Sequence, residues 1–131
     1  MIPLALMRSM LVIDGSLTVA GLLAEVFKNH GWNVDVCTDG ESAMDRLAGN
    51  DVYDVVLLSF RVTGTDGLKL IRFIRALEHR KTTAVMMVTG TPQIRNEALA
   101  AGADAVLLKP MGTNNLVESV ERLITQACPE L

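Results

Sequence analysis

The sequence predicts an α/β domain built on a doubly wound parallel sheet of five strands, with helices on both faces. Two observations support this fold class. Short aliphatic runs without polar alternation recur along the chain, as in strands that are buried on both faces of a parallel sheet. Each run precedes a segment whose apolar residues recur at a helical period. The 131 residues suit a single domain, 1–131, with its core at about residues 10–127.

The expected strands cover residues 10–13, 33–38, 55–58, 84–88 and 105–108, and the run at 55–58 has the composition of a central strand. A helix is expected after each strand. Before each of the first four helices the sequence carries residues that favour the start of a helix. These signals are Ser16 as an N-cap, Thr38 and Glu41 as a capping box, Asp66 as an N-cap, and Thr91 with Pro92 as an N-cap and N1 pair.

The second expected strand alternates, with Val34 and Val36 on one side and Asp35 and Cys37 on the other. Alternation of this kind is typical of an edge strand. Right-handed crossovers leave few ways to connect five such strands. The strand order 2-1-3-4-5, which is the flavodoxin-like order, is therefore expected.

Composition excludes several classes of function. The formal net charge of −3 gives no general reason to bind nucleic acid or an anionic membrane. Residues 1–7 are apolar but too short for a membrane helix, and Arg8 interrupts the pattern of a signal peptide. The two cysteines, Cys37 and Cys128, match no metal spacing and are interpreted as reduced thiols. These features predict a cytoplasmic protein.

Five motifs recur in order at the ends of the expected strands. They are VID at residues 12–14, DVVLLS at 54–59, GTDG at 64–67, VTG at 88–90 with AGAD at 101–104, and LKP at 108–110. Together, and at this spacing, the chain resembles the receiver domain of two-component response regulators over nearly its whole length.

The resemblance implies phosphotransfer signalling on a CheY-like fold. In that family an aspartate at the end of the third strand takes a phosphoryl group from a histidine kinase. Two acids after the first strand hold Mg²⁺, and a hydroxyl and a lysine contact the phosphoryl oxygens. By this resemblance Asp14 matches the first acid, Thr89 the hydroxyl and Lys109 the lysine, and Pro110 matches a proline that follows a cis peptide bond.

The chain departs from the family pattern where the chemistry occurs. Ser59 stands in place of the phosphoacceptor aspartate, and Gly15 in place of the second acid. Arg61 occupies the position whose backbone helps to form the metal site. Val106 replaces the aromatic residue that moves when the family switches. The residues of the phosphorylation site are therefore expected to be degenerate, and none of them is expected to be catalytic.

The substitutions predict a site that holds no cofactor. The family's site has three carboxylates and one lysine, a formal charge of −2. Here Asp14, Lys109 and an inward Arg61 would give +1, so Mg²⁺ is not expected and Asp14 is the only retained candidate ligand. We expect Asp14 to pair with Arg61 or Lys109. We expect Ser59, a poor nucleophile without an activating base or metal, to hydrogen-bond Thr89 or Lys109.

The sequence thus predicts a pseudo-receiver, a signalling and interaction module that is not an enzyme. The expected partner is a histidine kinase or an effector domain. A homodimer through the face of the fourth helix, fifth strand and fifth helix is also plausible within the family. Two alternatives stay open: a working phosphoacceptor that uses another acid, and a small flavodoxin-like domain that binds an anion. Phosphotransfer would separate the first from the pseudo-receiver, and ligand-dependent melting would expose the second.

Overall fold

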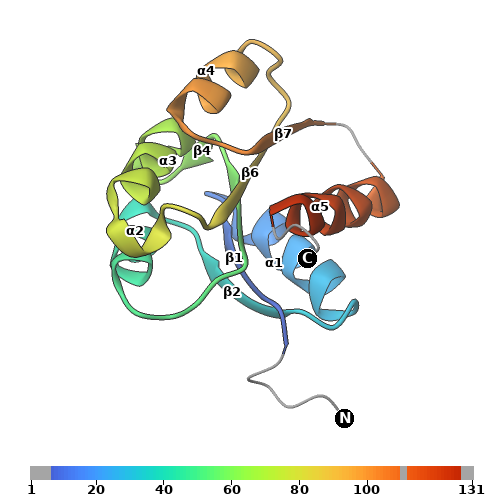
Figure 1. The fold of residues 1–131 in the computed structure, drawn as a ribbon. Helices are drawn as coiled ribbons and strands as arrows, with labels where there is room; N and C mark the ends of the chain where they lie inside the picture. The colour runs from blue at the N-terminus through green and yellow to red at the C-terminus, as the bar shows by residue number, and fades with distance from the viewer. Residues whose placement is uncertain (1–6, 110–111, 128–131) are drawn as a thin grey trace.

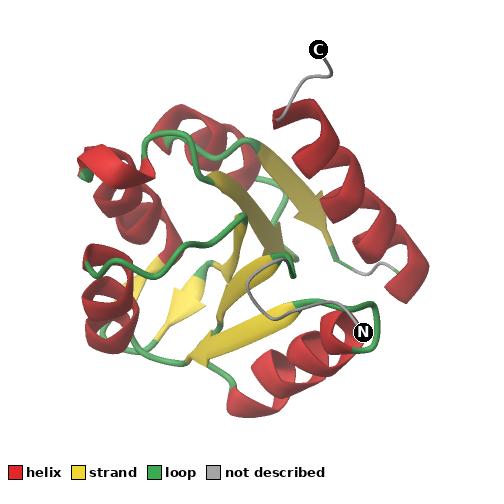
Figure 2. Ribbon diagram, turned by 60° about the horizontal axis from the view of Figure 1, so that its bottom comes forward, coloured by secondary structure: helices red, strands yellow, loops and turns green. Residues whose placement is uncertain are grey.

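The computed structural model describes residues 7–109 and 112–127. Its centre is a five-stranded parallel sheet with the order β2-β1-β3-β6-β7, which confirms the predicted order (Figures 1 and 2). Every strand of this sheet except the two at its edges is buried, because helices cover both faces. The strands are β1 (Ser9–Ile13), β2 (Asn33–Cys37), β3 (Val55–Ser59), β6 (Ala84–Thr89) and β7 (Ala105–Leu108).

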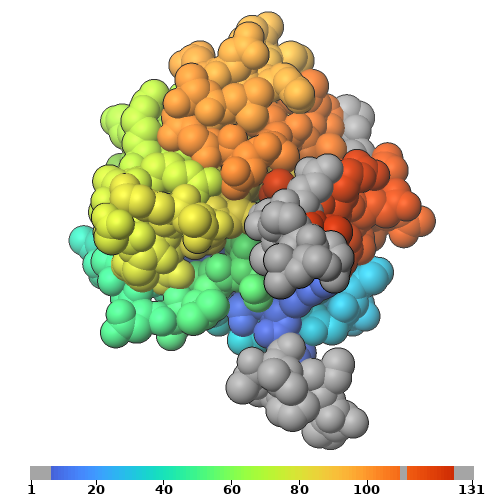
Figure 3. Space-filling model, viewed as in Figure 1, coloured from blue at the N-terminus to red at the C-terminus, as the bar shows by residue number. Residues whose placement is uncertain are grey.

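Two hydrophobic cores lie on opposite faces of the sheet. α1 (Leu17–Lys28) and α5 (Thr113–Ala127) cover one face. The other face is covered by α2 (Gly40–Ala48), α3 (Gly67–Ala76) and α4 (Ile94–Ala101), with the 3₁₀ turn η2 (Glu78–Arg80) after α3. In Figure 3 α4, in orange, lies against the yellow-green surface of α3. None of the helices in the described ranges is long and apolar enough to cross a membrane.

The helix starts agree with the sequence in two cases and differ in two. The predicted caps of α1 and α3 are confirmed: Ser16 Oγ accepts from Val19 N at 3.2 Å, and Asp66 Oδ1 accepts from Lys69 N at 2.9 Å. The capping box at 38–41 is wrong, because α2 is capped by Asp39. The prediction for α4 is also wrong. The helix begins only at Ile94, and Thr91 and Pro92 form the turn before it.

A small hairpin in the β3–α3 connection was not predicted. β4 (Arg61–Val62) and β5 (Thr65–Asp66) pair antiparallel around a two-residue turn. Gly64 in this turn has a φ of 84°, a conformation that residues with a Cβ rarely adopt. Gly40 N donates to the backbone oxygen of Thr63 at 2.9 Å, so the hairpin is tied to the start of α2. It forms one wall of the cleft described next.

Candidate functional site

The motif residues meet in a cleft at the carboxyl ends of the strands, where open α/β sheets bind their ligands. Asp14 follows β1, Ser59 ends β3, Thr89 ends β6, and Lys109 follows β7. The strand register places Ser59 beside Val88 and Thr89 beside Leu108 in neighbouring strands. The sequence therefore predicted correctly which residues the fold brings together. All four line one cleft with Gly15 and Arg61.

Asp14 and Ser59 form a buried pair at the bottom of this cleft. Their exposed fractions are 6% and 7%. Ser59 Oγ donates a hydrogen bond to Asp14 Oδ2, and Ser16 N donates to Asp14 Oδ1 at 2.9 Å. Both carboxylate oxygens of Asp14 are thus occupied by hydrogen bonds from within the chain.

The expected ion pair of Asp14 is wrong. The side chains of Arg61 and Lys109 are both exposed, and in the described part of the chain neither approaches Asp14 within ion-pair distance. The expected partners of Ser59 are wrong as well. β1 and β3 are direct neighbours, with Ile13 beside Leu58, so the residues that continue these strands meet each other first.

Arg61 contributes its backbone to the cleft, because its side chain points to solvent from the first position of the β4–β5 hairpin. Its carbonyl oxygen accepts a hydrogen bond from Gly15 N at 2.9 Å. A Cβ on Gly15 would lie 2.9 Å from that same oxygen, closer than such contacts normally occur. The position of the second acid is therefore closed to any side chain while the hairpin stays where it is. Sequence reasoning missed this contact, because strands of two residues carry no alternating pattern and Thr63-Gly64 is not among the dipeptides typical of hairpin turns.

Thr89 is the second buried hydroxyl of the cleft, with 5% exposure. Its Oγ1 accepts from Thr91 N at 3.1 Å, and its backbone oxygen accepts from Lys109 N at 2.8 Å.

Val106, at the predicted switch position, is half-buried against the core on the α3 and α4 side, and its backbone oxygen accepts from Arg95 Nη1 at 3.4 Å. Pro110, the predicted cis-proline position, lies outside the described residues.

The comparison with protein families decides the identity of this arrangement. The model for the response regulator receiver domain matches residues 10–121. The chain belongs to the response regulator receiver domain family.

Relatives of this receiver include several curated transcriptional regulatory proteins. CpxR of Escherichia coli strain K12 is 31% identical over 123 residues, which cover 92% of this chain and 51% of CpxR. ResD of Bacillus subtilis strain 168 is 30% identical over 120 residues, covering 89% of this chain and 48% of ResD. ZraR of Escherichia coli strain K12 is 27% identical, and the match covers 26% of ZraR. The receiver spans about half the length of these relatives or less.

Solved receiver structures share the fold. TrrA of Thermotoga maritima, a response regulator protein in complex with Mg²⁺–BeF, is 28% identical and superposes with a TM-score of 0.78, covering 89% of this chain and 99% of TrrA. The chemotaxis response regulator CheY4 of Vibrio cholerae is 24% identical, with a TM-score of 0.82 over 89% of this chain and 98% of CheY4. At 24% identity, the likeness to CheY4 shows a shared fold and nothing more.

The candidate metal ligands in this receiver do not fit the magnesium site of its family. Mg²⁺ requires oxygen ligands in near-octahedral geometry, usually including carboxylates. Asp14 supplies a single carboxylate, and both its oxygens already accept hydrogen bonds. The carbonyl oxygen of Arg61 is engaged by Gly15 N. Among residues 7–109 and 112–127, no three His, Cys, Asp or Glu side chains gather as a metal-binding group.

Proposed function

We propose that this receiver is a pseudo-receiver: a signalling and interaction module that takes no phosphoryl group at Ser59. The observation that carries the proposal is the Ser59–Asp14 pair. At the acceptor position there is a hydroxyl, and that hydroxyl donates a hydrogen bond to a buried carboxylate.

The chemistry of a serine at this position differs from that of an aspartate. A hydroxyl becomes a good nucleophile when an adjacent base removes its proton or a metal lowers its pKa. The carboxylate of Asp14 lies beside this hydroxyl, and it also accepts a hydrogen bond from Ser16 N, so we take it as a structural acceptor for Ser59. Each histidine is hydrogen-bonded away from the cleft. His30 Nδ1 bonds to Val26 O, and His79 Nε2 bonds to Leu47 O and Gly49 O.

The remaining acids near β3 have structural partners. Asp54 precedes β3 at its amino end, and its Oδ2 accepts from Ser9 N at 2.7 Å. Asp66 caps α3. Neither arrangement supports the alternative of a working phosphoacceptor that uses a substitute acid, because each carboxylate is committed to a backbone N–H.

The proposed signalling output is constitutive. A ligand shifts a conformational equilibrium only through its differential affinity for the two states. Val106 has one χ angle and no ring to move, and Ser59 offers no carboxylate for a phosphoryl group. We propose that the face of α4, β7 and α5 keeps one dominant conformation and binds a histidine kinase, an effector domain or a second copy of the chain, in the cytoplasm.

Backbone amide NMR spectra with and without Mg²⁺ and beryllofluoride test this proposal. Beryllofluoride mimics an aspartyl phosphate by bonding to a carboxylate. The spectra are expected to overlay for residues 89–102 and 103–116. A receiver that retains the acceptor aspartate, treated in parallel, provides the positive control for active beryllofluoride. Widespread shifts in those two segments would show that a switch survives in this chain.

A further inference from the structure

The outer edge of β2 carries backbone groups that no strand of the described chain uses. Asn33 N donates to Arg8 O, and Asp14 N donates to Cys37 O. In a parallel ladder this register makes residues 33, 35 and 37 face β1. The N–H and C=O groups of Val34 and Val36 therefore point away from the sheet. An unpaired edge of this kind is a template for another strand.

The two sides of this edge differ in chemistry. A groove beside β2 is lined on the α1 side by Leu17, whose exposed fraction is 71%, and by Val36. On the α2 side the groove is lined by carboxylates. These are Asp39, Asp45 and Asp51. A strand added here would alternate its side chains between an apolar and an acidic surface.

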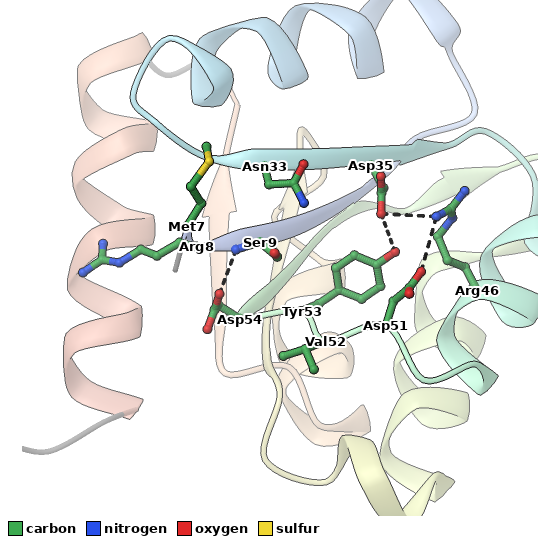
Figure 4. Close-up of a pocket in the computed structure, with 10 residues that line it drawn as sticks. All are labelled: Met7, Arg8, Ser9, Asn33, Asp35, Arg46, Asp51, Val52, Tyr53 and Asp54. Carbon is green, nitrogen blue, oxygen red and sulfur yellow. Dashed lines mark hydrogen bonds and ion pairs between the residues drawn. The ribbon is translucent and has the colours of Figure 1, made fainter. Parts of the chain in front are cut away.

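Charge decides what kind of strand fits. Residues 33–54 contain six carboxylates and one cation, Arg46, a formal charge of −5, whereas the whole chain carries −3. Arg46 is already used: it pairs with Asp35 at 3.2 Å and with Asp51 at 3.7 Å (Figure 4). Asp45 is exposed and has no ion-pair partner in residues 7–109 and 112–127. The groove therefore complements a positively charged occupant.

We propose that the outer edge of β2 is a docking site for an extended, basic segment of a partner protein. The segment adds to the sheet as a further strand, hydrogen-bonded to Val34 and Val36, and its alternate residues are apolar and cationic. The apolar residues pack on Leu17 and Val36, and the cations face Asp45 and Asp51. This surface lies on the sheet edge opposite β7, so it is independent of the proposed α4–β7–α5 interface.

A capped peptide of alternating lysine and valine is the probe. Titrated into the ¹⁵N-labelled domain at physiological ionic strength, it is expected to shift the amides of Val34 and Val36 and to slow their exchange with solvent. Two control peptides separate strand addition from charge attraction. In one, glutamate replaces lysine. In the other, a central valine is replaced by proline, which removes an N–H and breaks the strand. Each control is expected to bind at least about tenfold more weakly.

Variants of the domain provide a second test, in which the peptide stays the same and the groove is changed. Asp45→Lys is expected to weaken binding of the lysine–valine peptide by about tenfold. Glu97→Lys makes the same charge change on the exposed surface of α4, beside the opposite sheet edge, and is expected to leave binding unchanged. Circular dichroism establishes that both variants fold.

Three results would overturn the proposal. The first is equal binding of the proline peptide, which would indicate charge attraction without strand addition. The second is a set of peptide-induced shifts that omits Val34 and Val36. The third is protection of these two amides that grows with domain concentration alone, which would make a second copy of the chain the occupant.

Discussion

At the scale of single residues, the buried Ser59–Asp14 hydrogen bond replaces the charge cluster of an ordinary receiver. A buried carboxylate is costly unless hydrogen bonds satisfy it, and here Ser59 and Ser16 supply them. These two hydrogen bonds satisfy Asp14 in the cleft from within the chain. This explains why Asp14 needs neither Arg61 nor Lys109.

Ser59→Ala is predicted to lower the free energy of unfolding by about 1.5–3 kcal/mol, because it leaves a buried carboxylate oxygen without its donor. Ser42→Ala is the matched control. Ser42 Oγ donates to Asp39 Oδ2 at 3.1 Å, but this pair is exposed, so a loss within about 0.5 kcal/mol is expected. Urea denaturation measures both. Equal losses in the two variants would contradict the importance of the buried pair.

Gly15→Ala is predicted to destabilise the fold by about 1–3 kcal/mol, because the new Cβ would press on the carbonyl oxygen of Arg61 and displace the hairpin. Gly21→Ala provides the contrast. Gly21 lies on the exposed side of α1 with nothing within 4 Å of its Cβ position, so alanine is expected to stabilise by about 0.5–1 kcal/mol. Thermal or urea unfolding is expected to show a lower free energy of unfolding for Gly15→Ala and a higher one for Gly21→Ala. A neutral Gly15→Ala would show that the hairpin moves freely.

Residue positions in the cleft were predictable, but their partners were not. Asp14, Ser59, Thr89 and Lys109 follow buried strands whose ends must meet, so their proximity followed from the strand pattern. The direction of Arg61 depends on a hairpin of two-residue strands, which is too short to produce a periodic signal.

At the scale of elements, a polar network joins α2, β2 and the turn after α3. Arg80 is 2% exposed, donates through Nε to Leu47 O at 2.9 Å, and lies over the ring of Tyr53 at 5.3 Å. Tyr53 Oη donates to Asp35 Oδ2 at 2.7 Å (Figure 4). The network fixes the C-terminal end of α2 on the sheet. An arginine within the polar EHRK stretch at 78–81 gives no sign in the sequence that it is buried.

The ionisation of Tyr53 reports on this network. Burial, and then its hydrogen bond to Asp35, raise the pKa of Tyr53 well above its usual 10. Above pH 10, the folded chain therefore keeps the phenol proton at pH values at which the unfolded chain has lost it. The stability that Tyr53 contributes is complete below pH 10 and is lost as the pH rises from there toward the folded pKa.

Tyr53 is the only tyrosine of the chain, so tyrosinate absorbance follows this one group. The folded protein is predicted to show tyrosinate only well above pH 10, and the urea-unfolded protein at about pH 10. Tyr53→Phe should reduce the loss of stability between pH 10 and the alkaline unfolding transition. Coincident titrations of the folded and unfolded chains would contradict the buried hydrogen bond.

At the scale of the whole molecule, the receiver fold does not depend on the acids that make a receiver work. The two hydrophobic cores lie on the two faces of the sheet, and they contain the aliphatic strand residues that the sequence predicted. The helical periods were less exact, because Leu22 and Leu99, which they placed on buried faces, are 65% and 38% exposed. Three clustered carboxylates repel one another without a cation. In the cleft of this chain Asp14 is the one carboxylate that matches those positions, and it is hydrogen-bonded to Ser59, so the repulsion among three clustered acids does not arise there.

The most direct test of the account is the intact mass of the domain after incubation with acetyl phosphate, and separately with a phosphorylated histidine kinase, in the presence of Mg²⁺. A receiver that carries the acceptor aspartate, treated in the same way, establishes that the donors are active. The mass of this domain is predicted to stay unchanged under both conditions. A gain of one phosphoryl group that maps to Ser59 and disappears in Ser59→Ala would contradict the proposal that this receiver signals without phosphorylation at that site.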